Sequence, residues 1–230
     1  VLMFYPSKMC GNDGSIEDLK EKYPNITDPK ELDELVNPYK RSMQIYVTMD
    51  SEKQKHINSI MNGETYKWQN EVVDAGIAVV DVNSGAVVAV GAGRHRTGER
   101  QWNNASDEVR QIVSTSKPIY DYAPGIEYEN WSTYTPFFDE DYSYSDGTDI
   151  NNWDRKYNGL MTMRTALAQS RNVPALKAFQ ANKNSNIVSF STSLGLHPEL
   201  DSNNMAHEAH AIGGYQGETP LTMAAAYAAF

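Results

Sequence analysis

Two runs of apolar, β-branched residues constrain the fold of this chain most strongly. They cover residues 75–82 and 86–90, and only Asn83-Ser84-Gly85 separates them. Short runs rich in Val and Ile are typical of strands buried in a sheet, and a polar link that ends in Gly is typical of a tight antiparallel turn. We therefore predict a β-hairpin between buried strands, in a sheet domain that begins near Glu71.

Helical patterns surround this hairpin. Asp50 is placed to cap a helix over residues 51–61, and Thr219 with Pro220 has the composition of another helix start. Pro124 is expected to stop or bend the helix that precedes it. The helices expected after the hairpin cover residues 115–123, 161–168, 172–181, 187–194 and 219–230.

The first part of the chain has the composition of a connector. Residues 11–37 are acidic and rich in Asn, Asp and Pro, with one expected helix over residues 29–36. Residues 43–49 are rich in strand formers and precede the helix capped by Asp50, which predicts a small strand-plus-helix module.

Residues 131–158 contain many Tyr, Asp and Asn residues without a helical period. This composition predicts a long loop over a surface or a cleft. Asp146-Gly147 lies within it, but Tyr142 stands where a calcium loop would need its first ligand, so an EF-hand is excluded.

Composition excludes several classes of function. The chain has 20 Lys+Arg against 30 Asp+Glu, a net charge of −10, so nonspecific nucleic-acid binding is excluded. Cys10 is the single cysteine and forms neither an intramolecular disulfide nor a cysteine zinc site.

The segment His207-Glu208-Ala209-His210 spaces its histidines three apart, whereas a zinc-binding helix needs them four apart. We therefore expect a solvated polar loop, no metal and no cofactor. No run approaches the ~20 apolar residues that span a bilayer, so any membrane anchor is expected outside this chain.

The tetrapeptide Ser114-Thr115-Ser116-Lys117 fits the pattern Ser-x-x-Lys. Residues three apart share a helix face, which places the Lys117 amine beside the Ser114 hydroxyl, and a helix N-terminus favours the developing anion. No His is near Ser114 in the sequence, so a lysine kept neutral by desolvation or by neighbouring charge is the natural base. Alone, the pattern also arises by chance.

A second motif, Ser170-Arg171-Asn172, makes it less plausible that the Ser-x-x-Lys pattern arose by chance. Its hydroxyl is suited to relay a proton and its amide to hold a substrate carbonyl or a lysine. Alone, the triplet is also typical of a turn between two helices. Ser-x-x-Lys followed by Ser-x-Asn-x-Pro-Ala, behind two apolar strands, is much more specific than either motif.

With these motifs the chain resembles the penicillin-binding proteins, most closely the transpeptidase part of the bifunctional class A enzymes of Gram-positive bacteria. The resemblance covers about residues 42–230, and the first 40 residues match the preceding linker only loosely. It implies an α/β (α+β) fold like that of the serine β-lactamases, with helices flanking an antiparallel sheet. Residues 1–70 would be a linker module, and residues 71–230 the N-terminal part of the transpeptidase domain. The segments that carry the resemblance are residues 81–89, 117–124, 157–159, 166–175 and 223–230.

The resemblance also implies roles for the motif residues. Ser114 would be the acylated nucleophile and Lys117 the base that takes its proton. Ser170 would shuttle protons toward the leaving amine, and Asn172 would orient the substrate and Lys117. The third motif of the family, Lys-Thr/Ser-Gly on a strand, is absent and is expected on a C-terminal remainder beyond Phe230, because the chain ends inside an apolar helical run without a cap.

The implied activity is D-alanyl-D-alanine transpeptidation of peptidoglycan stem peptides, with β-lactams as substrate mimics. The implied location is the extracellular face of the bacterial cell membrane. Without the third motif, residues 1–230 alone are expected to be inactive. A D-Ala-D-Ala carboxypeptidase or a β-lactamase with the same motifs, and a non-catalytic wall-binding or sensor domain, remain as alternatives.

The sequence departs from the family in the residues beside the nucleophile. Ile112-Val113 stands where the family usually has Pro-Gly, and Ser116 where it has a bulky residue. These departures predict a different backbone bend at the site entrance and slower acylation by β-lactams.

Overall fold

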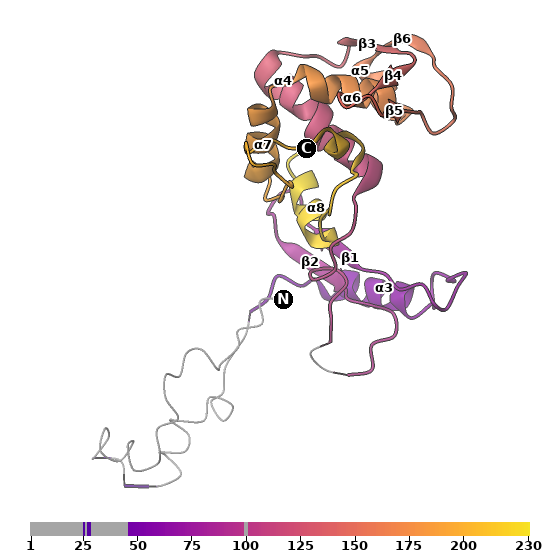
Figure 1. Cartoon of the computed structure of the whole chain (residues 1–230). Coiled ribbons are helices and arrows are strands. Elements are labelled where there is room, and N and C mark those ends of the chain that lie inside the picture. The colour runs from indigo at the N-terminus through magenta and orange to yellow at the C-terminus, as the bar shows by residue number, and fades with distance from the viewer. Residues whose placement is uncertain (1–24, 26, 29–45, 99–100) are drawn as a thin grey trace. The chain divides into compact units, whose positions relative to one another are not determined.

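The computed structural model describes residues 25, 27–28, 46–98 and 101–230 (Figure 1). Contacts divide the chain into two units, Val1–Met49 and Asp50–Phe230, and the second contains every helix and strand described below. The expected helix over residues 29–36 and Cys10 lie outside the described residues.

The strand predicted over residues 43–49 is wrong for the part that is described. Residues 46–49 are exposed and belong to none of the described strands. Strand propensity depends strongly on the packing of neighbouring residues, so it was a poor guide to residues 46–49. The assignment of residues 1–70 to a linker module stays a prediction.

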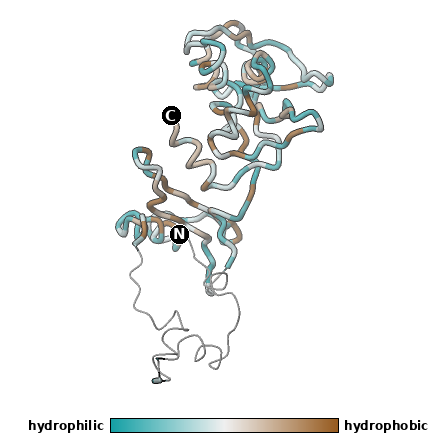
Figure 2. Tube along the Cα trace, turned by 90° about the vertical axis from the view of Figure 1, so that its left-hand side faces the viewer, coloured by the Kyte–Doolittle hydropathy of each residue, from teal (hydrophilic) through white to brown (hydrophobic). Residues whose placement is uncertain are grey.

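The hairpin and the helix before it are confirmed, but the strands are mostly half-buried rather than buried. Strands β1 (Ile77–Val80) and β2 (Val87–Gly91) pair antiparallel, and the strands are apolar along much of their length (Figures 1 and 2). Helix α3 (Ser51–Met61) begins where the Asp50 carboxylate accepts hydrogen bonds from two backbone N–H groups of its first turn. Ile57 and Met61 of α3 pack with Ala89 of β2 in a small core.

Residues 113–129 form consecutive helical turns of three kinds. They are the 3-10 helix η3 (Val113–Ser116), the π-helix η4 (Pro118–Tyr122) and helix α4 (Ala123–Glu129). Pro124 was expected to stop or bend the helix, and the prediction of a stop is wrong. Pro124 lies in the first turn of α4, where a missing N–H is tolerated, and the helix continues to Glu129.

The predicted loop over residues 131–158 is wrong in part, because short strands interrupt it. Strand β3 (Pro136–Asp139) pairs with β6 (Gly159–Thr162), and β4 (Tyr142–Ser143) pairs with β5 (Asp149–Ile150), both antiparallel. Strands of two to four residues are too short to show an alternating pattern in the sequence. Strand β6 also takes the first residues of the helix expected over residues 161–168.

The remaining helices follow the sequence patterns closely. Helices α5 (Met163–Ala168) and α6 (Asn172–Ala181) are present, α7 (Asn184–Ser193) begins three residues before the expected start, and α8 (Pro220–Tyr227) is capped by Thr219. Helix α8 ends at Tyr227 rather than at Phe230. The fold class is confirmed as helices mixed with antiparallel strands. No helix in the described ranges has the length and apolar character needed to cross a membrane.

The main core joins η4, α6 and α7. It fixes the helices next to the two motifs, because η4 follows Lys117 directly and α6 begins at Asn172. Its most deeply buried residues include Ile119, Tyr120, Val173, Leu176 and Ile187.

Candidate active site

The Lys117 amine is the centre of the candidate site. Its side chain is fully buried. Lys117 Nζ donates hydrogen bonds to the Ser170 carbonyl at 2.7 Å, to Ser170 Oγ at 3.1 Å and to Asn172 Oδ1 at 2.7 Å. The structure therefore brings together three of the four residues predicted from the motifs, and they account for all three donors of a lysine ammonium.

Ser114 lies one 3-10 turn before Lys117 and is exposed. Its carbonyl accepts the Lys117 backbone N–H, and residues three apart lie on the same side of a 3-10 helix. Among the hydrogen bonds of residues 101–230, none joins Ser114 Oγ to Lys117 Nζ. The other two hydroxyls of the motif are occupied. Ser116 is fully buried and donates to the Ala211 carbonyl at 3.1 Å, and Thr115 Oγ1 donates to the Ile112 carbonyl. Ser114 is therefore the exposed serine of the motif.

Burial controls the protonation of this site. Desolvation lowers the pKa of Lys117 to about 8, while Asp121 acts to raise it and Arg171 to lower it further. Asp121 is fully buried, and neither of its carboxyl oxygens has a hydrogen-bond partner among the described residues. Burial raises the pKa of Asp121 well above its usual range. Asp121 was not among the residues predicted from the sequence, although its position four residues after Lys117 in a helical stretch was the available signal.

The backbone is strained at both motifs. Val113 has φ 47° and Ser170 has φ 51°, values in the left-handed region that L residues other than Asn and Asp rarely adopt. Val113 stands where the family usually has Gly, which adopts this conformation readily. The departure from Pro-Gly therefore places a β-branched residue in a bend that favours glycine, and strain of this kind concentrates at functional sites.

The segment between α4 and α5 holds the second motif in place. Arg171 is buried and forms ion pairs with Asp139 at 2.9 Å and with Asp154 at 3.0 Å. Asn152 accepts a hydrogen bond from the Asn172 backbone N–H at 2.8 Å. These contacts were not predicted from the sequence, because nothing in the residue pattern shows where a long loop folds back.

The predicted solvated polar loop around His207 and His210 is wrong in part, because His207 is exposed as expected but His210 is not. Both lie at the 3-10 helix η5 (Glu208–Ile212), where His207 caps the N-terminus. His210 is buried, and its ring stacks on Tyr215 at 4.2 Å between ring centroids. Stacking on Tyr215 in the core stabilises His210, which the spacing of polar residues does not reveal. Among the described residues, no three His, Cys, Asp or Glu side chains gather as metal ligands.

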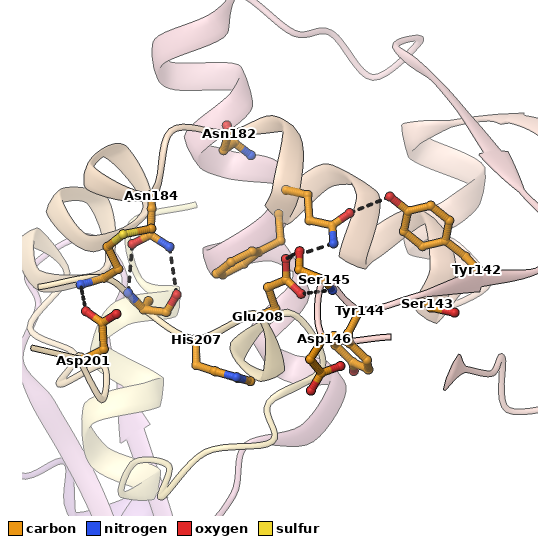
Figure 3. Close-up of a pocket in the computed structure, with 14 residues that line it drawn as sticks. Tyr142, Ser143, Tyr144, Ser145, Asp146, Asn182, Asn184, Asp201, His207 and Glu208 are labelled. Atoms are coloured by element: carbon orange, nitrogen blue, oxygen red, sulfur yellow. Dashed lines mark hydrogen bonds between the residues drawn. The ribbon is translucent and has the colours of Figure 1, made fainter. Parts of the chain in front are cut away.

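A separate cavity of about 930 Å³ lies near the C-terminal end of α6 (Figure 3). Tyr142 donates to Gln180 there, and Gln180 donates to Glu208. None of the four predicted site residues lines this cavity. It is therefore distinct from the site around Lys117.

Comparison with known proteins gives the same assignment for most of the chain. Residues 75–230 match the family model described as "Penicillin binding protein transpeptidase domain". "Penicillin-binding protein 1A/1B" of Bacillus subtilis is 44% identical over 203 residues, which are 87% of this chain and 22% of that protein. "Penicillin-binding protein 1A" of Streptococcus pneumoniae is 36% identical over 195 residues, 82% of this chain and 27% of that protein. The chain thus spans about a quarter of the length of these relatives.

Solved structures agree on the fold. Penicillin-binding protein 1A from Haemophilus influenzae aligns with a TM-score of 0.59 at 26% identity, over 67% of this chain and 23% of that one. The penicillin-binding protein PonA1 from Mycobacterium tuberculosis aligns with a TM-score of 0.70 at 18% identity, over 93% of this chain and 55% of that one. Together with the family match and the geometry around Lys117, these likenesses show that the chain belongs to the penicillin-binding protein transpeptidase domain family.

Proposed function

We propose that this chain is the N-terminal part of a serine D-alanyl-D-alanine transpeptidase domain that cross-links peptidoglycan stem peptides. The observation that carries the proposal is the buried Lys117 amine, held by Ser170 and Asn172 one helical turn after the exposed Ser114. A serine hydroxyl needs a base to become a nucleophile, and an amine with a pKa of about 8 is able to lose its proton near neutral pH.

In the proposed reaction, Ser114 Oγ attacks the carbonyl of the penultimate D-Ala, and Lys117 takes the hydroxyl proton. The carbonyl carbon forms a bond to Oγ, and the bond to the nitrogen of the terminal D-Ala breaks. Ser170 relays a proton to that nitrogen, so that D-Ala leaves as an amine. The amine nitrogen of a second stem peptide then bonds to the ester carbonyl carbon, the bond to Oγ breaks, and the proton that the amine loses returns to Oγ, which releases Ser114. The Ser114 N–H is one proposed donor to the oxyanion.

The proposal extends to the whole protein. Asn172 holds Lys117 and orients the substrate, and β-lactams acylate Ser114 as substrate mimics. A C-terminal remainder with a Lys-Thr/Ser-Gly strand supplies the second oxyanion donor, so residues 1–230 alone are inactive. The domain works on the extracellular face of the bacterial cell membrane.

The test is labelling of the full-length protein with a fluorescent penicillin, followed by peptide mapping of the adduct. We expect the adduct on Ser114 and none in Ser114→Ala. Ser116→Ala is the matched control, because it removes a nearby hydroxyl that is buried and donates to the Ala211 carbonyl. This variant should still be labelled. An adduct on Ser116, or labelling that persists in Ser114→Ala, would overturn the assignment. Product analysis with an acceptor amine then separates transpeptidation from hydrolysis by a carboxypeptidase or a β-lactamase.

A further inference from the structure

The side-chain amide of Asn172 has to face Lys117 in one orientation only. Its Oδ1 accepts from Lys117 Nζ at 2.7 Å, while its Nδ2 donates to the Asn151 carbonyl at 2.8 Å. Turning the amide over would place two donors against each other at Lys117 and two acceptors against each other at Asn151. The contact with Asn151 therefore selects the orientation that serves the lysine.

Asn152 holds the backbone of the same residue. Its Oδ1 accepts from the Asn172 N–H at 2.8 Å and from the Val173 N–H at 3.3 Å. These are the first N–H groups of α6, and Arg171, which precedes the helix, makes no capping hydrogen bond with its side chain. Asn152 thus caps α6 from a distant segment, in place of a residue at the helix start.

Asn152 is itself fixed from the other side. Its Nδ2 donates to Asp139 Oδ1 at 2.7 Å and to the Lys156 carbonyl at 2.9 Å. The other oxygen of Asp139 accepts from Arg171 Nε at 2.9 Å. Asp139, Asn152 and Arg171 are each at most 2% exposed, so this network is closed to water. The same part of the fold carries β3 to β6 and α6 (Figure 1).

We propose that Asn152 and Asp139 are positioning residues for the transpeptidase reaction, which act by holding Asn172 in register with Lys117. The inference rests on the proposed function of Lys117 as the base. Asp139 fixes the orientation of the Asn152 side chain, and Asn152 fixes the position of the first turn of α6. From this turn the Asn172 side chain reaches the Lys117 amine. A purely structural network would stabilise the fold without changing the reaction of the folded molecules.

The experiment is a double-mutant cycle on the full-length protein, with Asn152→Ala, Asn172→Ala and both together. The readout is the rate of acylation by a fluorescent penicillin per folded molecule, with the folded fraction taken from thermal unfolding. Because small misplacement at a reacting centre reduces rates by as much as about 10²-fold, we expect a loss of about 10- to 10²-fold in Asn152→Ala. The double variant should be no slower than Asn172→Ala alone.

An asparagine outside this network supplies the matched control. Asn83 is exposed in the turn between β1 and β2 and takes part in no contact around Lys117, so Asn83→Ala should acylate at the wild-type rate. Where Asn152→Ala fails to fold, Asp139→Asn takes its place in the cycle, because it keeps the shape of the side chain and removes the charge that faces Arg171.

Two results would overturn the inference, and they are distinguishable. If the losses in the single variants multiply in the double variant, Asn152 does not act through Asn172, while the proposed function stands. The same holds if Asn152→Ala only lowers the folded fraction. If the wild-type protein is not labelled at all, the proposed function fails and this inference fails with it.

Discussion

Gly213 lies directly against the backbone of Val113, the residue before Ser114. A Cβ atom on Gly213 would lie 2.2 Å from the Val113 carbonyl oxygen and 2.4 Å from its nitrogen. Gly213 follows η5 with φ +74°, and Ala211 in η5 accepts the hydrogen bond from Ser116. The end of η5 therefore supports the turn that presents Ser114.

Gly213→Ala is expected to displace this turn. The added methyl group has no room beside the Val113 backbone, and the left-handed conformation adds about 1–2 kcal/mol of strain. We expect penicillin labelling of Ser114 to slow by about 10²-fold, because the nucleophile moves relative to the site. Stopped-flow measurement of acylation checks this.

Gly195→Ala is the control for that experiment. Gly195 also has a positive φ, +80°, but no atom lies within 4 Å of its Cβ position. It should show the strain as a lower melting temperature and leave the acylation rate of the folded protein unchanged. Equal rate losses in both variants would refute the role of the contact with Val113.

Val113→Gly is expected to preserve or raise stability. The change relieves about 1–2 kcal/mol of left-handed strain and adds about 0.5–1 kcal/mol of chain entropy in the unfolded state. Little packing is lost, because Val113 is 63% exposed. Val109→Gly is the control, since Val109 is also exposed but has no positive φ, and it should only destabilise. Urea unfolding of both variants decides; an equal loss of stability would mean that Val113 is not strained.

Acylation should rise with pH through the titration of Lys117. Burial lowers the pKa of Lys117 to about 8, and only the neutral amine accepts a proton. The rate should therefore be low below pH 8, increase through about pH 8 and level off above it.

Lys117→Arg should lower the rate by about 10²- to 10⁴-fold, because Arg does not deprotonate. A near-normal rate in Lys117→Arg would make Lys117 an electrostatic anchor rather than a base.

Asp121→Asn should move this pH profile to lower pH. The interaction with Asp121 raises the pKa of Lys117, so removing the charge lets the pKa of the amine fall. The midpoint of acylation against pH is the measurement. Asp146→Asn is the control, because Asp146 is exposed and does not line the site. An unchanged midpoint in Asp121→Asn would show that the carboxyl is uncharged across this pH range.

The two motifs were readable in the sequence because each lies within a few residues. A helical turn places Ser114 near Lys117 whatever the rest of the chain does, and the Ser-x-Asn triplet begins a helix that its own period predicts. Helices α3 and α6 were predicted at their observed bounds for the same reason.

The contacts that complete the site were not readable. Asn152 reaches Asn172 only because β3 and β6 pair and fold the intervening segment back, and pairs of short strands leave no sequence period. His210 was taken for a solvated residue because its partner, Tyr215, is brought to it by a turn rather than by helical spacing. Tertiary packing decided both cases.

The wide turn of η4 has a consequence for the length of this helical segment. A π-helix closes its hydrogen bonds over five residues, one more than an α-helix, so Pro118–Tyr122 carries one residue beyond a regular turn. Each residue of an α-helix adds about 100° of rotation. Trp131 follows α4 and its backbone N–H donates to the Gly125 carbonyl, so it moves with the helix. Deleting a single residue between Lys117 and Ala123 would swing α4 by about that angle and turn the Trp131 ring away from Phe137 of β3, which it contacts at 5.4 Å between ring centroids. This stretch is therefore constrained in its number of residues, and insertions or deletions here should be far less tolerated than substitutions of exposed side chains.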